Sequence, residues 1–247
     1  MFDFTISLAG RNIGISARYE VLKRYCTKYL TDEKPEFVVF ATDEDIAYEK
    51  EKSRREDIIE GRPVFKYPTC YLESLAVYRR IAEKLLDYDI ILFHGSALSV
   101  DGEGFLFTAK SGTGKSTHTS FWRQQFGDRV IMVNDDKPLL QIREDGVWVY
   151  GTPWDGKHRI STNTSARLSG LCILTRAEEN FIEPVSVDAA MPTILQQSYR
   201  PADPVKMIKL MKLLDKMMKK TCLYRLGCNL DPQAAIVAYE GMTRKEK

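Results

Sequence analysis

The sequence predicts an α/β protein with a mixed β-sheet core and a smaller α+β region at its N-terminus. A short apolar strand over 104–108 is followed by a glycine-containing loop and then by a helix that should end near Gly127. Asp101-Gly102 before the strand is typical of a two-residue hairpin turn, so the preceding strand should run antiparallel. A second strand over 129–133 follows the helix, and a strand–helix–strand unit makes a parallel crossover. A sheet with both strand orientations follows from these observations.

The composition is that of an ordinary globular protein, which we expect in the cytoplasm. Hydrophobic residues make up 44% and charged residues 28% of the 247 residues. The net charge of +2 gives no argument for binding to nucleic acid or to a membrane. No apolar run approaches the roughly 18–20 residues of a membrane-spanning helix. The first residues also lack the basic leader and apolar core of a signal peptide.

The five cysteines are expected to be buried, reduced thiols. Their number is odd and no C-x-x-C pair occurs, which fits neither a disulfide framework nor a metal site. They are Cys26, Cys70, Cys172, Cys222 and Cys228.

Residues 1–89 are expected to form the smaller α+β region, although no repeat or low-complexity linker marks its end. Apolar and polar residues alternate over 2–18, which predicts two strands joined by a turn at Gly10-Arg11-Asn12. The charged segment 43–61 is interpreted as solvated strands and loop, with a regulatory or docking segment as the alternative. The remaining predicted elements are a helix over 19–29, a buried strand over 35–42 and an amphipathic helix over 71–88.

Residues 90–247 are expected to form the core that carries the chemistry. Outside the central stretch, the predicted elements are a buried strand over 90–100, a hairpin about 144–146, a central strand over 168–175, helices over 188–198 and 204–221, a short strand over 223–226 and a helix beginning at Asp231-Pro232. The helix over 204–221 has a lysine-rich face, which we interpret as a solvated surface, with a basic docking surface as the alternative.

The segment from Ala109 to Ser116 matches a phosphate-binding loop, with alanine in place of the first glycine. Gly112 and Gly114 allow the backbone to bend so that successive N–H groups point at an anion, and the dipole of the following helix adds favourable potential. Lys115 supplies a positive charge for the β- and γ-phosphates, and the hydroxyl of Ser116 can bind Mg²⁺. The expected ATP-binding residues are Ser111, Gly112, Thr113, Gly114, Lys115, Ser116 and Thr117.

An acidic pair, Asp135-Asp136, follows the strand over 129–133. The crossover should bring this pair beside the loop at the carboxyl ends of the strands, where ligands bind in open α/β sheets. Adjacent residues of a regular strand point to opposite faces, so both carboxylates serve one site only if the strand curls, and Lys137-Pro138 is a plausible place for that. One acid should then hold the metal and the other accept a proton from a hydroxyl.

His94 is predicted to lie at the mouth of the loop. If Val100 faces Glu103 across the hairpin turn, counting back places His94 opposite Ala109, whereas a slip of one residue would remove the argument. The other two histidines have no comparable case for a functional role.

The same count applied to the second hairpin brings the loop over 152–159 near Asp136. This loop could contact nucleotide or acceptor, with Trp154 stacking and Lys157 or Arg159 pairing with phosphate. A structural aromatic turn is the equal alternative.

These motifs resemble the HPr kinase/phosphorylase and phosphoenolpyruvate carboxykinase superfamily, and in particular its small HPr kinase-like proteins. The resembling segments are His94-Gly95, the strand over 102–108, the loop over 111–116 and the strand end over 133–136. The resemblance implies a phosphate-loop core with a mixed sheet. Thr117 departs from the acidic residue usual in HPr kinases and is closer to the carboxykinases.

The resemblance also implies roles for individual residues. Asp135 would act as the base toward a serine hydroxyl, and Asp136 with Ser116 would serve Mg²⁺. Lys115 and His94 match the phosphate-site residues of the family and complete the expected catalytic set with Asp135.

We therefore expect a Mg²⁺-dependent, ATP-using kinase that transfers a phosphoryl group to a serine-type hydroxyl in a protein, peptide or small molecule. The sequence is compatible with a homo-oligomer and indicates neither a nucleic-acid nor a membrane partner. The alternative is a catalytically inactive nucleotide-binding regulatory or scaffold protein. Closure of the acceptor site by the loop over 152–159 would favour a small-molecule kinase over a protein kinase.

Overall fold

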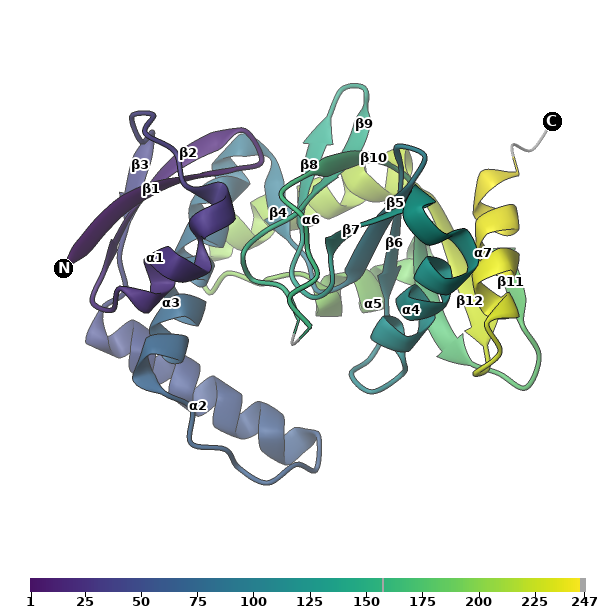
Figure 1. Ribbon diagram of the computed structural model, residues 1–247, viewed down its shortest axis with the longest axis horizontal. Coiled ribbons are helices and arrows are strands. Elements are labelled where there is room, and N and C mark those ends of the chain that lie inside the picture. The colour runs from purple at the N-terminus through teal and green to yellow at the C-terminus, as the bar shows by residue number, and fades with distance from the viewer. Residues whose placement is uncertain (157, 245–247) are drawn as a thin grey trace. The chain divides into compact units, whose positions relative to one another are not determined.

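The computed structural model describes residues 1–156 and 158–244. Its chain divides into two units, Met1–Leu85 and Leu86–Lys247, each with its own β-sheet (Figure 1). The predicted loop residue Lys157 lies outside the described residues. Within the part of the chain that the structure describes, no helix is long and apolar enough to cross a membrane.

The first unit contains a three-stranded sheet in the order β1-β2-β3. As predicted, the N-terminal residues form a hairpin, in which β1 (Phe2–Leu8) pairs antiparallel with β2 (Arg11–Ala17). The turn consists of Ala9 and Gly10, whose φ angles of 50° and 73° are the left-handed pair of a type I′ turn. The turn therefore lies one residue earlier than the predicted Gly10-Arg11-Asn12.

Two predictions for residues 19–42 were too long. The buried strand expected over 35–42 is only β3 (Phe37–Val39), which pairs parallel with β2 at the sheet edge. Its central residue Val38 is 59% exposed, because an edge strand is covered on fewer sides. The helix expected over 19–29 is a short α1 (Val21–Tyr25), followed by one 3₁₀ turn.

The charged segment 43–61 is a helix, α2 (Asp43–Ile59), and the prediction of solvated strands and loop was wrong. Thr42 caps its first turn: the Thr42 hydroxyl accepts a hydrogen bond from the Asp45 amide, and the Asp45 carboxylate accepts one from the Thr42 amide. The residues on the inner face of α2 recur at every fourth position and are polar. The segment therefore lacks the apolar periodicity that would have predicted a helix. Its buried polar residues are Asp45, Glu49, Ser53 and Asp57.

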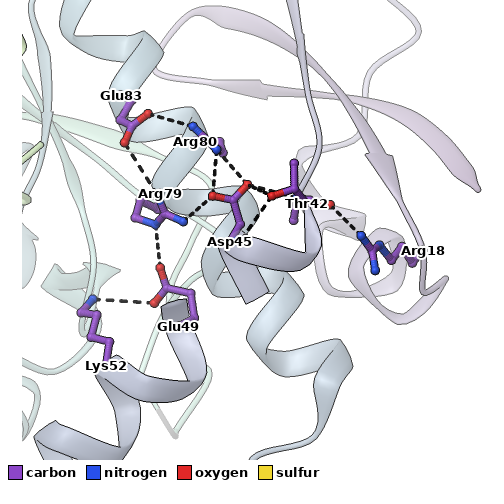
Figure 2. Close-up of polar contacts among 9 residues, drawn as sticks. Arg18, Thr42, Asp45, Glu49, Lys52, Arg79, Arg80 and Glu83 are labelled. Carbon is purple, nitrogen blue, oxygen red and sulfur yellow. Dashed lines mark hydrogen bonds and ion pairs between the residues drawn. The ribbon is translucent and has the colours of Figure 1, made fainter. Parts of the chain in front are cut away.

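The partner of this polar face is α3 (Thr69–Leu85), the amphipathic helix that the sequence predicted. Arg79 of α3 pairs with Asp45 at 2.7 Å and with Glu49 at 2.8 Å, and Arg80 pairs with Asp45 at 2.8 Å (Figure 2). Buried carboxylates are tolerated only when charged partners and hydrogen bonds replace the lost water. The arginines of α3 therefore make the acidic face of α2 a packing surface.

The second unit is built on a nine-stranded mixed sheet with the main strand order β4-β8-β9-β10-β6-β5-β7, in which β12 also pairs with β10 and β11. The pairs of β10 with β6 and with β12 are parallel, and the other pairs are antiparallel. The strands are β4 (Ile90–Leu92), β5 (Ser96–Val100), β6 (Glu103–Thr108), β7 (Val130–Asn134), β8 (Leu139–Arg143), β9 (Gly146–Tyr150), β10 (Ser165–Arg176), β11 (Phe181–Pro184) and β12 (Cys222–Cys228). The mixed α/β fold predicted from the sequence is confirmed at this level.

Helices cover both faces of this sheet (Figure 1). Side chains alternate along β6, so Leu106 faces the cluster made with α5 (Val187–Gln197) and α6 (Pro204–Lys220). Its neighbours Phe105 and Phe107 face the opposite cluster, made with α4 (Lys115–Phe126) and α7 (Gln233–Thr243). The predicted hairpin about 144–146, the central strand and the four helices of this unit are all present.

The single strand expected over 90–100 is two strands in different parts of the sheet. β4 pairs with β8, whereas β5 lies between β6 and β7. The interruption has a local cause: the amide of His94 donates to Gln197 O at 2.7 Å, and the amide of Gly95 donates to Asp136 O at 3.0 Å. These two amides thus bond to residues outside the sheet ladder, and the strand is interrupted between β4 and β5.

Two smaller expectations also change. The crossover from β6 through α4 to β7 is present, but β5 lies between the two strands that it connects. The five cysteines are free thiols, as expected, although only Cys26 and Cys172 are buried and Cys222 is exposed.

Candidate functional site

The loop between β6 and α4 has the conformation that its glycines allow. Gly112 and Gly114 adopt φ angles of 75° and 116°, in the left-handed region where a side chain is strained. Ala109, which replaces the first glycine of the motif, is buried and is absent from the described residues with positive φ. Its methyl group is therefore accommodated without backbone strain, and the departure from the motif has a structural explanation.

Two contacts hold the loop in place. The amide of Thr113 donates to Lys110 O at 3.2 Å, and the guanidinium of Arg176, at the end of β10, donates to Gly112 O at 2.8 Å. Lys115 Nζ lies 3.5 Å from Ala109 O, so the lysine side chain folds back over the loop.

The first turn of α4 offers free donors to an anion. Ser116 and Thr117 are exposed there, and the first amides of a helix have no intrahelical acceptor. The helix dipole adds positive potential at this end. Ser111 and Gly112 are exposed on the loop before it. The arrangement suits a bound phosphate chain.

Aromatic packing fixes α4 on the sheet. Trp122 is fully buried, with its ring centroid 5.0 Å from that of Phe105 and 5.3 Å from that of Phe107. Its indole N–H donates to His118 Nε2 at 2.9 Å. Burial lowers the pKa of His118 to about 3, so this histidine stays neutral and belongs to the core. The turn that carries Lys115 is thus held by contacts deeper in the same helix.

The acid pair follows the end of β7, and Asn134 shapes its turn. Asn134 Oδ1 accepts hydrogen bonds from the amides of Asp136 and Lys137, and Asn134 Nδ2 donates to Thr152 O at 3.2 Å. The chain thus curls at the predicted place. The two carboxylates point to different partners rather than to opposite faces of a strand.

Asp135 is linked to the first turns of α4. Its Oδ1 accepts a 2.8 Å hydrogen bond from the Ser96 hydroxyl, and Ser96 Oγ lies 3.4 Å from Thr119 Oγ1. Thr119 Oγ1 in turn lies 3.3 Å from the carbonyl oxygens of both Lys115 and Ser116. The structure therefore connects the predicted base to the helix turn that carries the predicted phosphate ligands.

Asp136 meets two positively polarised side chains. Its Oδ1 lies 3.4 Å from His94 Nε2, and its Oδ2 pairs with the ammonium group of Lys137. The hairpin has the predicted register, from Val100↔Glu103 to Ser96↔Phe107, but the ladder ends before His94, whose carbonyl oxygen accepts a hydrogen bond from the Thr108 hydroxyl at 3.0 Å. The His94 side chain, 40% exposed, contacts Asp136 among the predicted site residues.

The environments of the two acids shift their pKa values in opposite directions. Burial raises the pKa of Asp135, although the hydrogen bond from Ser96 opposes the shift. Burial alone would also raise the pKa of Asp136. The charge of Lys137 and the hydrogen bond of His94 outweigh burial and hold that pKa well below its usual range. Asp135 is the better proton acceptor, and Asp136 stays ionised.

The loop over 152–159 lies against the acids, as the hairpin count predicted. The Ser161 hydroxyl accepts a hydrogen bond from the Asp135 amide at 3.2 Å, and a Cβ atom on Gly156 would lie 3.1 Å from Asp135 Oδ2. Trp154 is 3% exposed, so its ring is not available to stack on a nucleotide. The stacking interpretation of Trp154 was therefore wrong, and its burial agrees with the alternative of a structural aromatic turn.

Sequence reasoning missed the residues that hold the acids in place. They are Ser96, Thr119, Asn134 and Ser161, together with Lys137, which was noted only as a position where the strand could curl. Single serine, threonine and asparagine residues are common in turns, strands and helices, so no sequence signal marked these positions.

A metal bound by the protein alone is not indicated: the described residues contain no group of three or more His, Cys, Asp or Glu side chains that could hold one. Asp136 and the Ser116 hydroxyl are the candidate ligands. That donor set fits Mg²⁺, which is usually bound by one or two protein oxygens plus substrate phosphates and water.

The comparisons with known proteins give a distant structural likeness and no match in sequence. No protein-family model and no curated protein sequence matches this chain. Among solved structures, the chain is similar to the Hpr(Ser) kinase/phosphatase from Coxiella burnetii, with 11% sequence identity and a TM-score of 0.33. The match covers 61% of this chain and 95% of that protein.

Proposed function

We propose that this chain is an ATP-using, Mg²⁺-dependent kinase with a phosphate-loop core, which transfers a phosphoryl group to a hydroxyl acceptor. The observation that supports this most is the pair of adjacent acids with opposite pKa shifts, connected to a helix that begins at Lys115-Ser116. Neighbouring titratable groups whose environments separate their pKa values are typical of divided acid–base and electrostatic roles.

The loop and the first turn of α4 would bind the phosphates of ATP. The amides near Ser116 and Thr117 donate to phosphate oxygens, and Lys115 offsets charge that develops as the phosphoryl group moves. Asp136 and Ser116 would bind the Mg²⁺ that accompanies ATP and neutralises part of its charge. Asp136 would share its carboxylate between that ion and Lys137, and His94 orients it from the other side.

Asp135 would accept the proton of the acceptor hydroxyl. The acceptor oxygen forms a bond to the γ-phosphorus while the bond from that phosphorus to the β,γ-bridging oxygen breaks, and ADP leaves with the electron pair. The Ser96 hydroxyl holds Oδ1 of Asp135, which leaves Oδ2 for the proton. Transfer is then completed when Asp135 returns the proton to water.

Nucleotide binding and transfer can be tested separately. Lys115→Ala should weaken ATP binding at least tenfold in calorimetric titration, since it removes a charged phosphate ligand. Gln124→Ala is the matched control, because it changes an exposed residue of the same helix outside the loop and should bind ATP nearly as well. Unchanged affinity in Lys115→Ala would refute the loop assignment.

Asp135→Asn should bind ATP normally and lose transfer of labelled phosphate by about 10²- to 10⁴-fold, the usual contribution of a general base. Full activity in this variant would show that Asp135 is not the base. ATP binding without transfer by the wild type, to protein, peptide or small hydroxyl compounds, would instead favour a nucleotide-binding regulatory protein.

A further inference from the structure

We propose that Arg176, at the end of β10, is a further ATP-binding residue, which holds the phosphate loop through Gly112 and binds the α-phosphate. This inference rests on the proposed kinase function and fixes the direction in which ATP lies in its site. Three features of the structure support it: the bond from Arg176 to the loop, the extension of β10 beside the loop, and the order of the strands.

The contact between Arg176 and the loop helps to fix one peptide group at both ends. Arg176 Nη2 donates to Gly112 O at 2.8 Å. The amide of Thr113, which belongs to the same planar peptide group, donates to Lys110 O at 3.2 Å. A carbonyl oxygen turned toward bound phosphates would repel them. A guanidinium bound to Gly112 O therefore favours the loop conformation that keeps this oxygen away from the anion.

The Arg176 side chain has more donors than the loop uses. A guanidinium carries five N–H groups in a planar fork and can bind a phosphate through two parallel hydrogen bonds. One nitrogen of the exposed Arg176 side chain is directed to Gly112 O. The positive charge is thus held beside residues that are expected to bind phosphate, and it can neutralise a phosphate without releasing the loop.

The strand β10 extends far enough to bring Arg176 to the level of the loop. The pairing of β10 with β6 ends at Ile173↔Thr108, and β10 continues for three residues, about 10 Å, beyond this pair. Side chains alternate along a strand, so Arg176 points to the same face as Leu174, which packs in the cluster made with α4. Arg176 therefore leaves the sheet on the side where the loop enters α4.

Neighbouring hydrogen bonds fix the backbone on both sides of Arg176. The Thr175 hydroxyl donates to Leu226 O at 3.2 Å, and the amide of Ala177 donates to Cys228 O at 3.1 Å. Arg176 itself is the partner of Cys228 in the ladder of β10 and β12. The side chain thus extends from an ordered strand end, so little of its backbone has to become ordered when ATP binds.

The order of the strands decides which phosphate Arg176 meets. β10 and β7 lie on opposite sides of β6, in the order β10-β6-β5-β7. The acids Asp135 and Asp136 follow β7, and the proposed transfer needs the γ-phosphate beside them. If the phosphate chain crosses the loop after β6, its α-phosphate lies on the side of β10. The nucleoside then lies toward the segments that follow β10 and β12, residues 177–180 and 229–232.

These two segments are joined to each other. The amide of Asn229 donates to Asn180 Oδ1 at 3.0 Å, and Asn229 Nδ2 donates to Glu178 O at 2.8 Å. Leu230 follows directly, is 81% exposed and offers an apolar side chain to a base. The nucleoside would therefore meet a continuous surface next to Arg176.

The first test separates the charge of Arg176 from its bond to the loop. Arg176→Gln keeps an amide that can donate to Gly112 O but removes the charge, and it should weaken ATP binding about 10- to 100-fold in calorimetric titration. Arg176→Lys keeps the charge and should bind ATP more tightly than Arg176→Gln, whereas equal affinity in the two variants would contradict a role for the charge. Arg225→Gln is the matched control on the adjacent strand β12, where Arg225 is paired with Glu183, and its ATP affinity should not change.

Titration with ADP shows which phosphate Arg176 binds. ATP and ADP share the α-phosphate, so Arg176→Gln should weaken the binding of both nucleotides by the same factor. Lys115→Ala should weaken ATP binding more than ADP binding, because Lys115 serves the β- and γ-phosphates. At saturating ATP, kcat of Arg176→Gln should be nearly unchanged while KM for ATP rises, as expected for a contact that is equal in the ground state and the transition state.

The position of the base can be mapped independently. Photolabelling with 8-azido-ATP should modify residues within 177–180 or 229–232, and an excess of ATP should prevent the modification. Modification of the loop over 152–159 would place the base beside the acids and would reverse the direction of the nucleotide.

Three outcomes would overturn the inference while the proposed kinase function stands. Wild-type ATP affinity in Arg176→Gln would show that Arg176 acts only through its bond to Gly112. A loss of affinity for ATP with none for ADP would show that Arg176 meets the γ-phosphate, and photolabelling beside the acids would exclude the proposed direction. A wild-type protein that binds neither ATP nor ADP would contradict the proposed function itself.

Discussion

Helices α2 and α4 are each packed within their own unit, but by opposite kinds of contact. The inner face of α2 is acidic, and Asp45 and Glu49 pair with the arginines of α3. The inner face of α4 is aromatic, with Trp122 buried among the phenylalanines of β6. Two helices of similar prominence in the fold thus depend on different physical interactions.

This difference in packing indicates which of the two helices is better suited to carry a reactive site. Apolar packing is dense and insensitive to salt and pH, so α4 presents its first turn in one fixed position. Ion pairs between helices specify partners by charge and geometry, but their strength depends on protonation and, where exposed, on salt. We therefore expect α4 to be destabilised by removal of buried apolar side chains, and α2 by removal of the charged partners of its acidic face.

The largest effect should follow from loss of the aromatic anchor. Trp122→Ala removes a fully buried side chain and should lower the free energy of unfolding by roughly 3–5 kcal/mol. The three tryptophans of the chain all lie in the second unit, so fluorescence of Trp148 and Trp154 during chemical denaturation reports on this unit alone. Trp148→Ala is the control at a partly exposed position, and an equal effect there would contradict the special role of Trp122.

A smaller loss of stability is expected when the ion pairs between α2 and α3 are broken. Arg79→Met leaves Glu49 with only the longer 3.8 Å contact to Lys52 and leaves Asp45 with Arg80 alone, which should destabilise α2 by roughly 2–4 kcal/mol. The first unit contains no tryptophan, so the change is best followed by hydrogen exchange of the α2 amides. The control Arg54→Met removes only an exposed pair with Glu51 and should cost less than about 0.5 kcal/mol. Similar exchange in both variants would show that the buried pairs do not hold α2.

The smallest expected effect is the change in the stability of α2 with pH. Burial opposes ionisation of Asp45, but the Thr42 amide and the two arginines outweigh it and lower its pKa from 3.8 to about 2. A lowered folded-state pKa contributes stability that is present above pH 4 and is lost as pH falls through about 2. The contribution is about 2 kcal/mol. The difference in α2 stability between wild type and Asp45→Asn should therefore shrink from pH 5 to pH 2, as measured by hydrogen exchange. A constant difference would contradict the assignment.

Local patterns in the sequence were enough for most of the second unit. The hairpin register from Val100 and Glu103, the helix beginning at Lys115 and the strand β10 were predicted because each has a strong turn or periodicity signal. The break at His94 was not predicted, because its cause is a pair of hydrogen bonds to Gln197 and Asp136, which are distant in the sequence.

The helix α2 illustrates the other limit. Its residues have no apolar stripe, and a charged stripe has the same appearance in the sequence as a solvated surface. Only the arginines of α3, some thirty residues further along the chain, make its acidic face a buried one.

The sequence by itself predicted a phosphate-binding loop and placed two acids after a strand, because those signals lie in consecutive residues. Only the tertiary structure decided how the acids differ. Asp135 and Asp136 are adjacent in the chain, yet the first meets Ser96, Gly156 and Ser161, and the second meets His94 and Lys137. The pKa of a carboxyl group depends on burial and on the charges that surround it in space. The sequence identifies the two acidic residues, and the tertiary structure gives them different environments.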